Sequence, residues 1–134
     1  MNGMLDRWLG GKQSGRLWPL LVWCTVIFLF SQMPGSGLAV EPPLWYVLER
    51  KSAHVVEYAV LAWLAYRFFA AQYPRETHRW LVILTLAFVV AYGTLDEVHQ
   101  AFVFGRGARF TDVMIDGIGG GLALFFISVL RSKR

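Results

Sequence analysis

Ionisable and amide side chains recur at helical spacing in three clusters, and their types are those that transfer protons or bind ions. Residues three or four apart share one face of a helix, so each cluster is expected to form one polar patch. A histidine among carboxyl groups is suited to proton transfer near neutral pH. The three clusters are Lys51, His54 and Glu57; Asp96, Glu97 and Gln100; and Asp112 and Asp116.

Four apolar stretches contain or border these clusters, and short polar connections join them. Each stretch is close to the about 20 helical residues that cross a hydrocarbon core of about 30 Å. Charged residues make up only 16% of the chain, against about 25% in soluble proteins. The sequence therefore predicts an all-α, polytopic membrane protein with four transmembrane helices, in the stretches 17–33, 53–71, 80–95 and 113–130.

The distribution of basic residues predicts the orientation, because cytoplasmic flanks are enriched in Lys and Arg. Basic residues flank the first stretch at its start, the second connection and the end of the chain. Both termini are therefore expected in the cytoplasm, with the three clusters on the outer side of a bacterial inner membrane. The residues that set this orientation are Arg7, Lys12, Arg16, Arg67, Arg75, Arg79, Arg131, Lys133 and Arg134.

The predicted organisation is a cytoplasmic lead (1–16), a four-helix membrane domain (17–130) and a basic cytoplasmic tail (131–134). The basic start and the apolar run also fit a signal peptide, but no clean cleavage motif follows. Basic residues spread over three flanks argue against nucleic-acid binding. No phosphate loop, nucleophile elbow or paired-cysteine motif occurs, so no cofactor is predicted.

Several local features carry separate predictions. Residues 44–48 are predicted as a short interfacial helix. Ser52 is a candidate cap for the helix that follows, although Lys51 and His54 favour a start one turn earlier. His78 is expected to be solvated in the inner connection. Gly117 and Gly121 have the small-xxx-small spacing that lets helices approach closely in lipid, which predicts a face for oligomer formation.

The clusters are also expected to interact with one another. At a rise of about 1.5 Å per residue, Glu57, Asp96 and Asp116 would lie at similar depths below the outer surface. Three carboxylates at one depth cannot all stay ionised without cationic partners, a bound cation or shared protons. Lys51, Arg106 and Arg109 are the basic residues expected to serve as cationic partners.

Two motifs combine these residues. The first is Lys51-x-x-His54-x-x-Glu57-Tyr58-x-x-Leu61. The second is Asp96-Glu97-x-x-Gln100-x-Phe102-x-x-Gly105-Arg106, with Asp112, Asp116 and Gly119 after it. Together they resemble the VanZ-like membrane proteins, named for a glycopeptide-resistance accessory protein. Val55 and Phe104 depart from the aromatic residue and the proline that are frequent in that family.

The resemblance implies a small helical membrane protein with a link to reduced teicoplanin susceptibility, and it implies neither a reaction nor a substrate. An outward-facing site fits that link, because teicoplanin acts on cell-wall precursors outside the membrane.

Three functions remain open from the residues. The first is an outer site that binds or acts on an envelope or lipid-linked ligand. Arg106 and Arg109 would bind phosphate or carboxylate, and His54 with Glu57 or Asp96 would act as acid and base. Whether a reaction is catalysed stays open.

The second function is structural or partner-binding. Lys51 or Arg106 would pair with Asp112, Asp116 or Glu57 so that the helix ends are fastened together, and interaction with a larger envelope protein belongs to the same class. The third is a proton-coupled carrier, against which the inner halves of the stretches contain few polar groups. A metal site made of His54, Glu57 and the aspartates also stays open.

Overall fold

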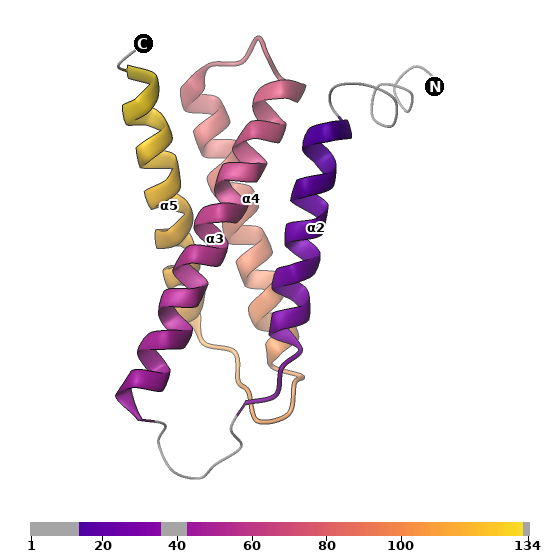
Figure 1. The fold of residues 1–134 in the computed structure, drawn as a ribbon, viewed down its shortest axis with the longest axis vertical. Helices are drawn as coiled ribbons and strands as arrows, with labels where there is room; N and C mark the ends of the chain where they lie inside the picture. Colours follow the sequence, from indigo (N-terminus) through magenta and orange to yellow (C-terminus); the bar gives the residue numbers. More distant parts are fainter. Residues whose placement is uncertain (1–13, 36–42, 133–134) are drawn as a thin grey trace.

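The computed structural model describes residues 14–35 and 43–132, and in these residues the chain forms four helices and no strand. Each helix runs opposite to its predecessor, and the four pack side by side in a bundle (Figure 1). α3 contacts each of the other three helices. The all-α prediction is confirmed for the described residues, whose helices are α2 (Ser14–Ser31), α3 (Leu44–Gln72), α4 (His78–Gln100) and α5 (Phe110–Ser132).

The helix boundaries follow local chemistry. α2 ends shortly before Pro34, and α3 ends before Pro74, because a residue that precedes proline avoids helical geometry. Thr77 caps α4, since its Oγ1 accepts a hydrogen bond of 3.2 Å from the Trp80 backbone N–H. Asp112 lies in the first turn of α5, where a negative charge complements the helix dipole.

One boundary prediction is wrong. Residues 44–48 are the first turn of α3 and not a separate helix, so Ser52 lies inside α3 rather than at a cap. The Ser52 hydroxyl donates to the Glu49 carbonyl at 2.9 Å. Pro43, with φ of −60°, precedes the helix, and neither Gly nor Pro interrupts the chain between it and Ser52, so nothing breaks the helix there.

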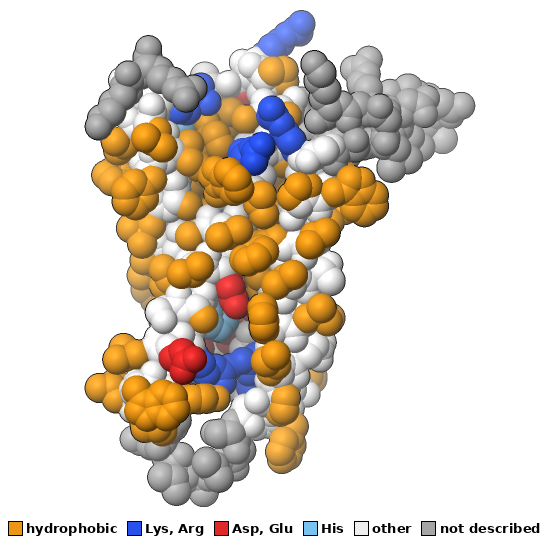
Figure 2. Space-filling view, in the orientation of Figure 1, with side chains coloured by type: hydrophobic (Ala, Val, Ile, Leu, Met, Phe, Trp, Pro, Cys, Tyr) orange, Lys and Arg blue, Asp and Glu red, His pale blue; other side chains and the backbone are white. Residues whose placement is uncertain are grey.

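The bundle is apolar on its outside and carries a buried polar network at one end. Large hydrophobic side chains such as Leu29, Ile83 and Phe125 are exposed on the helix faces that point away from the bundle. Figure 2 shows hydrophobic side chains over the middle of one face of the molecule, with Lys and Arg towards both ends. A soluble protein rarely exposes so much contiguous apolar surface. The buried polar residues are Ser31, Thr85, Asp96, Glu97, Gln100 and Asp116.

Two helices, α4 and α5, are long and apolar enough to cross a membrane, with mean hydropathies of 1.8 and 2.0. α2 is apolar over the shorter range Gly15–Ser31. α3 has sufficient length, but Glu49, Arg50 and Lys51 fall within its first third. Four transmembrane helices and the orientation of the termini stay predictions. Most of the predicted lead, and Lys133 and Arg134 of the predicted tail, lie outside the described residues.

Close helix contacts in this chain use other glycines than the predicted pair. A Cβ on Gly119 would overlap the backbone of Val55 on α3, and a Cβ on Gly120 would lie 2.9 Å from Val89 Cγ1 on α4. Within the described residues, a Cβ on Gly121 would meet no atom within 4 Å. α5 therefore packs against α3 and α4 through Gly119 and Gly120.

A hydrogen-bonded network also joins three helices at the end opposite the polar clusters. His78 Nδ1 lies 2.8 Å from the Tyr66 hydroxyl, and His78 Nε2 lies 2.9 Å from the Ser128 hydroxyl. Arg131 donates to the Tyr66 hydroxyl at 2.9 Å. The expectation that His78 is solvated is wrong, because both ring nitrogens have partners on neighbouring helices.

Candidate functional site

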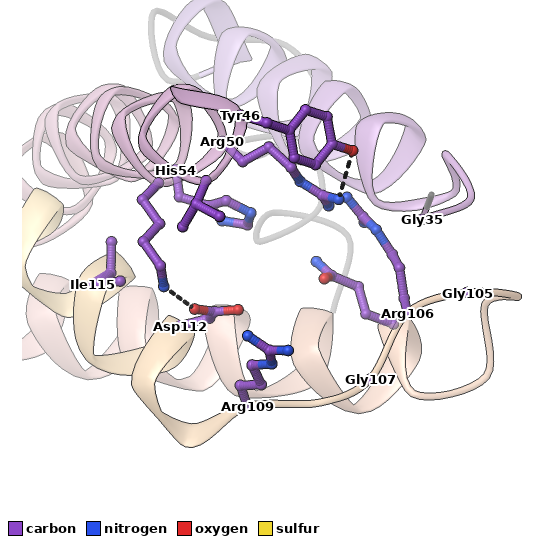
Figure 3. Close-up of a pocket in the computed structure, with 13 residues that line it drawn as sticks. Gly35, Tyr46, Arg50, His54, Gly105, Arg106, Gly107, Arg109, Asp112 and Ile115 are labelled. Atoms are coloured by element: carbon purple, nitrogen blue, oxygen red, sulfur yellow. Dashed lines mark hydrogen bonds and ion pairs between the residues drawn. The ribbon is translucent and has the colours of Figure 1, made fainter. Parts of the chain in front are cut away.

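A cavity of about 270 Å³ lies at the end of the bundle where α3 and α5 begin and α4 ends. Its walls come from α3, the end of α4, the 101–109 loop and the first turns of α5. Figure 3 shows the side chains of Arg50, Arg106, Arg109 and His54 directed into this common space. The lining residues are Gly35, Tyr46, Val47, Arg50, Lys51, His54, Gln100, Gly105, Arg106, Gly107, Arg109, Asp112 and Ile115.

The described lining is strongly cationic. Three arginines and Lys51 face a single acidic side chain, Asp112. Lys51 Nζ and Asp112 Oδ1 form an ion pair at 2.9 Å, which joins α3 to α5. Arg50 donates to the Tyr46 hydroxyl at 3.4 Å, and it forms no ion pair with a carboxylate in the described residues. The excess positive charge makes the cavity suited to an anion.

The 101–109 loop is held against α2 and α4 by hydrogen bonds. Arg106 Nη1 donates to the Ser31 carbonyl at 2.9 Å, and the Arg109 backbone N–H donates to Glu97 Oε2 at 2.9 Å. Gly105 has a φ of 73°, a left-handed conformation that favours glycine. A side chain on Gly35 would overlap the Gly105 backbone, so the two chain segments meet without a gap.

His54 lines the cavity, and Asp116 lies behind it. His54 Nδ1 lies 3.1 Å from Asp116 Oδ1, and Asp116 is fully buried at 0% exposure. The His54 ring stacks on Tyr58, with ring centroids 6.3 Å apart. His54 Nε2 has no hydrogen-bond partner in the described residues.

A second buried network lies beside the cavity and connects α2 with α4. The Ser31 hydroxyl donates to Asp96 Oδ1, and the Gln100 side-chain amide donates to Asp96 Oδ2 at 2.8 Å. The same amide also lies 3.3 Å from the Ser31 hydroxyl. Gln100 lines the cavity and Asp96 does not. Asp96 therefore lies behind the lining and is hydrogen-bonded to Gln100, which contacts the cavity.

The structure brings most of the predicted site residues to one end of the bundle and separates them into two layers. Glu57 is half-buried on α3, outside the lining, and no described residue donates a hydrogen bond to its carboxylate. In the described residues, no three His, Cys, Asp or Glu side chains are arranged to hold a metal ion. Lys51, His54, Gln100, Arg106 and Asp112 line the cavity, while Asp96, Glu97 and Asp116 lie behind it.

Sequence reasoning missed Arg50 and Tyr46 as lining residues. Arg50 is four residues before His54, so helical spacing placed both on one face of α3. The prediction of a separate helix at 44–48 obscured that signal, because it detached this stretch from the face that carries His54.

An apolar exterior, an internal polar network and two helices suited to crossing a bilayer define a helical membrane protein. The family model described as VanZ/LLP1 matches residues 17–131, and the chain belongs to this family. It is a membrane protein of the VanZ kind, as its two motifs indicated. No curated protein and no solved structure shows significant similarity to the chain.

Proposed function

We propose that this chain is a four-helix inner-membrane protein whose outward-facing cavity binds the anionic head group of a lipid-linked or cell-envelope ligand. The observation that carries the proposal is the cationic lining, in which Arg50, Lys51, Arg106 and Arg109 outnumber Asp112. Guanidinium groups pair with phosphate and carboxylate oxygens through two parallel hydrogen bonds. A cavity of about 270 Å³ has room for such a group together with several waters.

Arg106 supplies a second argument for an anionic ligand. Its Nη1 is bound to the Ser31 carbonyl, while its Nε is buried and has no partner in the described residues. A buried donor without an acceptor costs about 1–3 kcal/mol. An oxygen of a bound head group would satisfy this N–H, so ligand binding would remove that cost.

The surroundings of the cavity favour a ligand with a lipid anchor. Phe102 and Phe104 are 85% and 84% exposed at the end of α4 and in the loop, and Leu44, Trp45 and Phe110 are exposed at the starts of α3 and α5. Aromatic side chains concentrate where a bilayer meets water. A cavity inside such a ring would lie at the depth of lipid head groups.

The positive-inside rule supports the orientation. Arg16, Arg67, Arg75, Arg79 and Arg131 all lie towards the bundle end opposite the cavity, at the start of α2, around the α3–α4 turn and at the end of α5. With that end in the cytoplasm, the cavity faces outward. The lead at 1–16 and the tail at 131–134 would then flank a membrane domain of residues 17–130.

Cysteine labelling tests the orientation. In a Cys24→Ala background, Ala108→Cys in the loop beside the cavity should react with a membrane-impermeant maleimide in intact cells. Glu76→Cys in the α3–α4 turn should react only after the cells are opened. The reverse pattern would place the cavity in the cytoplasm and overturn the outward-facing proposal.

Lipid titration tests binding. We expect short-chain phosphatidic acid, added to the purified protein in neutral detergent, to bind about tenfold more weakly to Arg109→Gln than to wild type, because a charged hydrogen bond contributes about 1.5–3 kcal/mol. Arg79→Gln removes the same charge from the opposite end and should bind as wild type does. If lipid binding weakens equally in both variants, the effect comes from net charge alone, and the proposal of a specific site at the cavity is wrong.

The link to glycopeptides is tested in cells. We propose that a Gram-positive host that expresses this chain becomes less susceptible to teicoplanin. The protection should be lost in His54→Ala, Glu57→Gln and Asp96→Asn at matched membrane levels. Protection that survives all three changes would leave the polar cluster with a structural role alone.

A structural role is the second candidate, and the Lys51–Asp112 ion pair between α3 and α5 favours it. If fastening is the whole role, Lys51→Met combined with Asp112→Leu should retain a folded bundle and full cellular function. Association of copies through Gly117 and Gly121 is a further proposal, tested by disulfide cross-linking of Gly121→Cys in the Cys24→Ala background.

A further inference from the structure

His54 is held in a way that leaves one ring nitrogen able to take up a proton inside the cationic cavity. Its Nδ1 is bound to Asp116 Oδ1 at 3.1 Å, and its Nε2 has no partner in the described residues. A neutral imidazole with Nδ1–H towards the carboxylate has its lone pair on Nε2. This arrangement is that of a general base whose tautomer is fixed by a buried acid.

In the described residues, the Asp116 side chain has no hydrogen-bond partner other than His54. It is fully buried, its Oδ2 has no hydrogen-bond partner in the described residues, and the Lys51 ammonium is paired with Asp112 instead. A carboxylate in this position stabilises the imidazolium that forms when His54 accepts a proton. Asp116 is therefore a positioning residue for His54.

The cations of the lining occupy the same cavity as His54. Arg50, Arg106 and Arg109 are positioned to bind phosphoryl oxygens and to stabilise the negative charge that builds up on them during substitution at phosphorus. A general base and an anion clamp in one cavity are two of the elements that promote hydrolysis of a phosphate ester. Binding alone would need the arginines but would not need a histidine held by a buried carboxylate.

We propose that the site hydrolyses the terminal phosphate of its lipid ligand, an inference that rests on the anion-binding function proposed above. His54 Nε2 takes a proton from a water molecule, and the water oxygen forms a bond to phosphorus. The bond between phosphorus and the leaving oxygen then breaks. The proton passes from His54 through solvent to the leaving group, and inorganic phosphate and the dephosphorylated lipid are the products.

The test measures binding and phosphate release on the same purified protein in mixed detergent–lipid micelles. The lipid probes are phosphatidic acid, which carries a phosphate monoester, and farnesyl diphosphate, which carries a phosphate anhydride. Glycerol 3-phosphate presents the same phosphate without a lipid chain. The variants are wild type, His54→Gln, Asp116→Asn and the control His99→Gln, which changes a histidine on α4 outside the cavity lining.

We expect wild type and His99→Gln to release inorganic phosphate from at least one lipid probe. His54→Gln should release it at least 100-fold more slowly while it still binds the lipid, since a general base contributes about 10²- to 10⁴-fold. Asp116→Asn should lower kcat at unchanged KM, because it orients His54 and does not touch the ligand. A merely structural role for Asp116 would instead disturb folding and binding together.

Each of the other outcomes contradicts one specific part of the proposal. Lipid binding without release from either probe would overturn the hydrolysis and leave the binding function standing. If neither lipid binds, the proposed anion-binding function itself is wrong. If His54→Gln still releases phosphate at the wild-type rate, the reaction does not take place in this cavity. If glycerol 3-phosphate releases phosphate as fast as the lipids do, the substrate does not need a lipid chain.

Discussion

Gly119 of α5 lies directly against the backbone of Val55 of α3, with no space for a side chain between the two helices. Val55 follows His54 in the sequence, and Gly119 comes one helical turn after Asp116. The close approach of these two backbones therefore sets the separation at which the His54 ring meets the Asp116 carboxylate. A packing contact in the bundle thus controls the geometry of the His54–Asp116 pair beside the cavity.

Gly119→Ala is expected to push α3 and α5 apart. The new Cβ would lie 3.0 Å from Val55 Cα and closer still to the Val55 carbonyl oxygen. Overpacking of this kind costs about 1–3 kcal/mol, so thermal unfolding in detergent should occur at a lower temperature. Gly121→Ala is the matched control, since its Cβ meets no described atom within 4 Å. If Gly121→Ala lowers the unfolding temperature as much, the α3 contact is not the cause.

His78→Ala should destabilise the bundle without affecting the cavity. The substitution leaves the Tyr66 and Ser128 hydroxyls without their shared partner. Hydrogen bonds between transmembrane helices contribute about 0.6 kcal/mol on average and at most about 1.7 kcal/mol. Chemical unfolding should register a loss of this order, while phosphatidic acid binds with unchanged affinity. Ser132→Ala, which removes an exposed hydroxyl bound within its own helix, is the control. Weaker lipid binding in His78→Ala would show that the two ends of the bundle are coupled.

Asp112→Asn should tighten the binding of an anionic lipid. The change removes the single acidic side chain of the described lining and releases Lys51 from its ion pair. Because both partners are partly exposed, the gain should be small, about twofold to fivefold, in line with about 0.2–1 kcal/mol for exposed pairs. The gain should shrink as salt is added. Titration with phosphatidic acid at two salt concentrations measures both effects. Weaker binding would mean that Asp112 orients Lys51 towards the ligand rather than competing with it.

Ser31→Ala should lower the free energy of unfolding by more than the loss of one small hydroxyl group suggests. It removes a donor to the buried Asp96 carboxylate, and an unsatisfied buried group costs about 1–3 kcal/mol. Thr25→Ala is a suitable control, because the Thr25 hydroxyl is exposed and donates to Leu21 of its own helix. Denaturant midpoints in detergent would rank the two variants. A midpoint for Ser31→Ala equal to that of Thr25→Ala would show that Gln100 alone satisfies Asp96.

The sequence predicted the helical segments and the end of the bundle at which the polar residues gather. Span length and hydropathy are local properties, and alternating chain direction then brings the three clusters together. The Lys51–Asp112 pair was one of the structural pairings that the residues allowed. The family was recognisable because its two motifs combine rare polar residues at fixed spacing.

The partner of His54 was not predictable in the same way. Helical rise puts Glu57, Asp96 and Asp116 at similar depths, and only helix rotation and tilt decide which carboxylate reaches the ring. Rotation also decided that Gly119, rather than Gly117, faces α3. These angles arise from packing between helices, which no single segment encodes.

The continuity of α3 has a consequence for the membrane around the protein. Its 29 residues span about 43 Å, well beyond a hydrocarbon core of about 30 Å, whereas α4 and α5 have 23 residues each. The apolar stretch 53–71 accounts for about 28 Å of that length. In the predicted four-span arrangement, the first turns of α3, with Tyr46 and Arg50 of the cavity wall, would therefore project beyond the hydrocarbon core into the head-group layer. The charge of the neighbouring lipid head groups would then act directly on that wall, with no change in sequence.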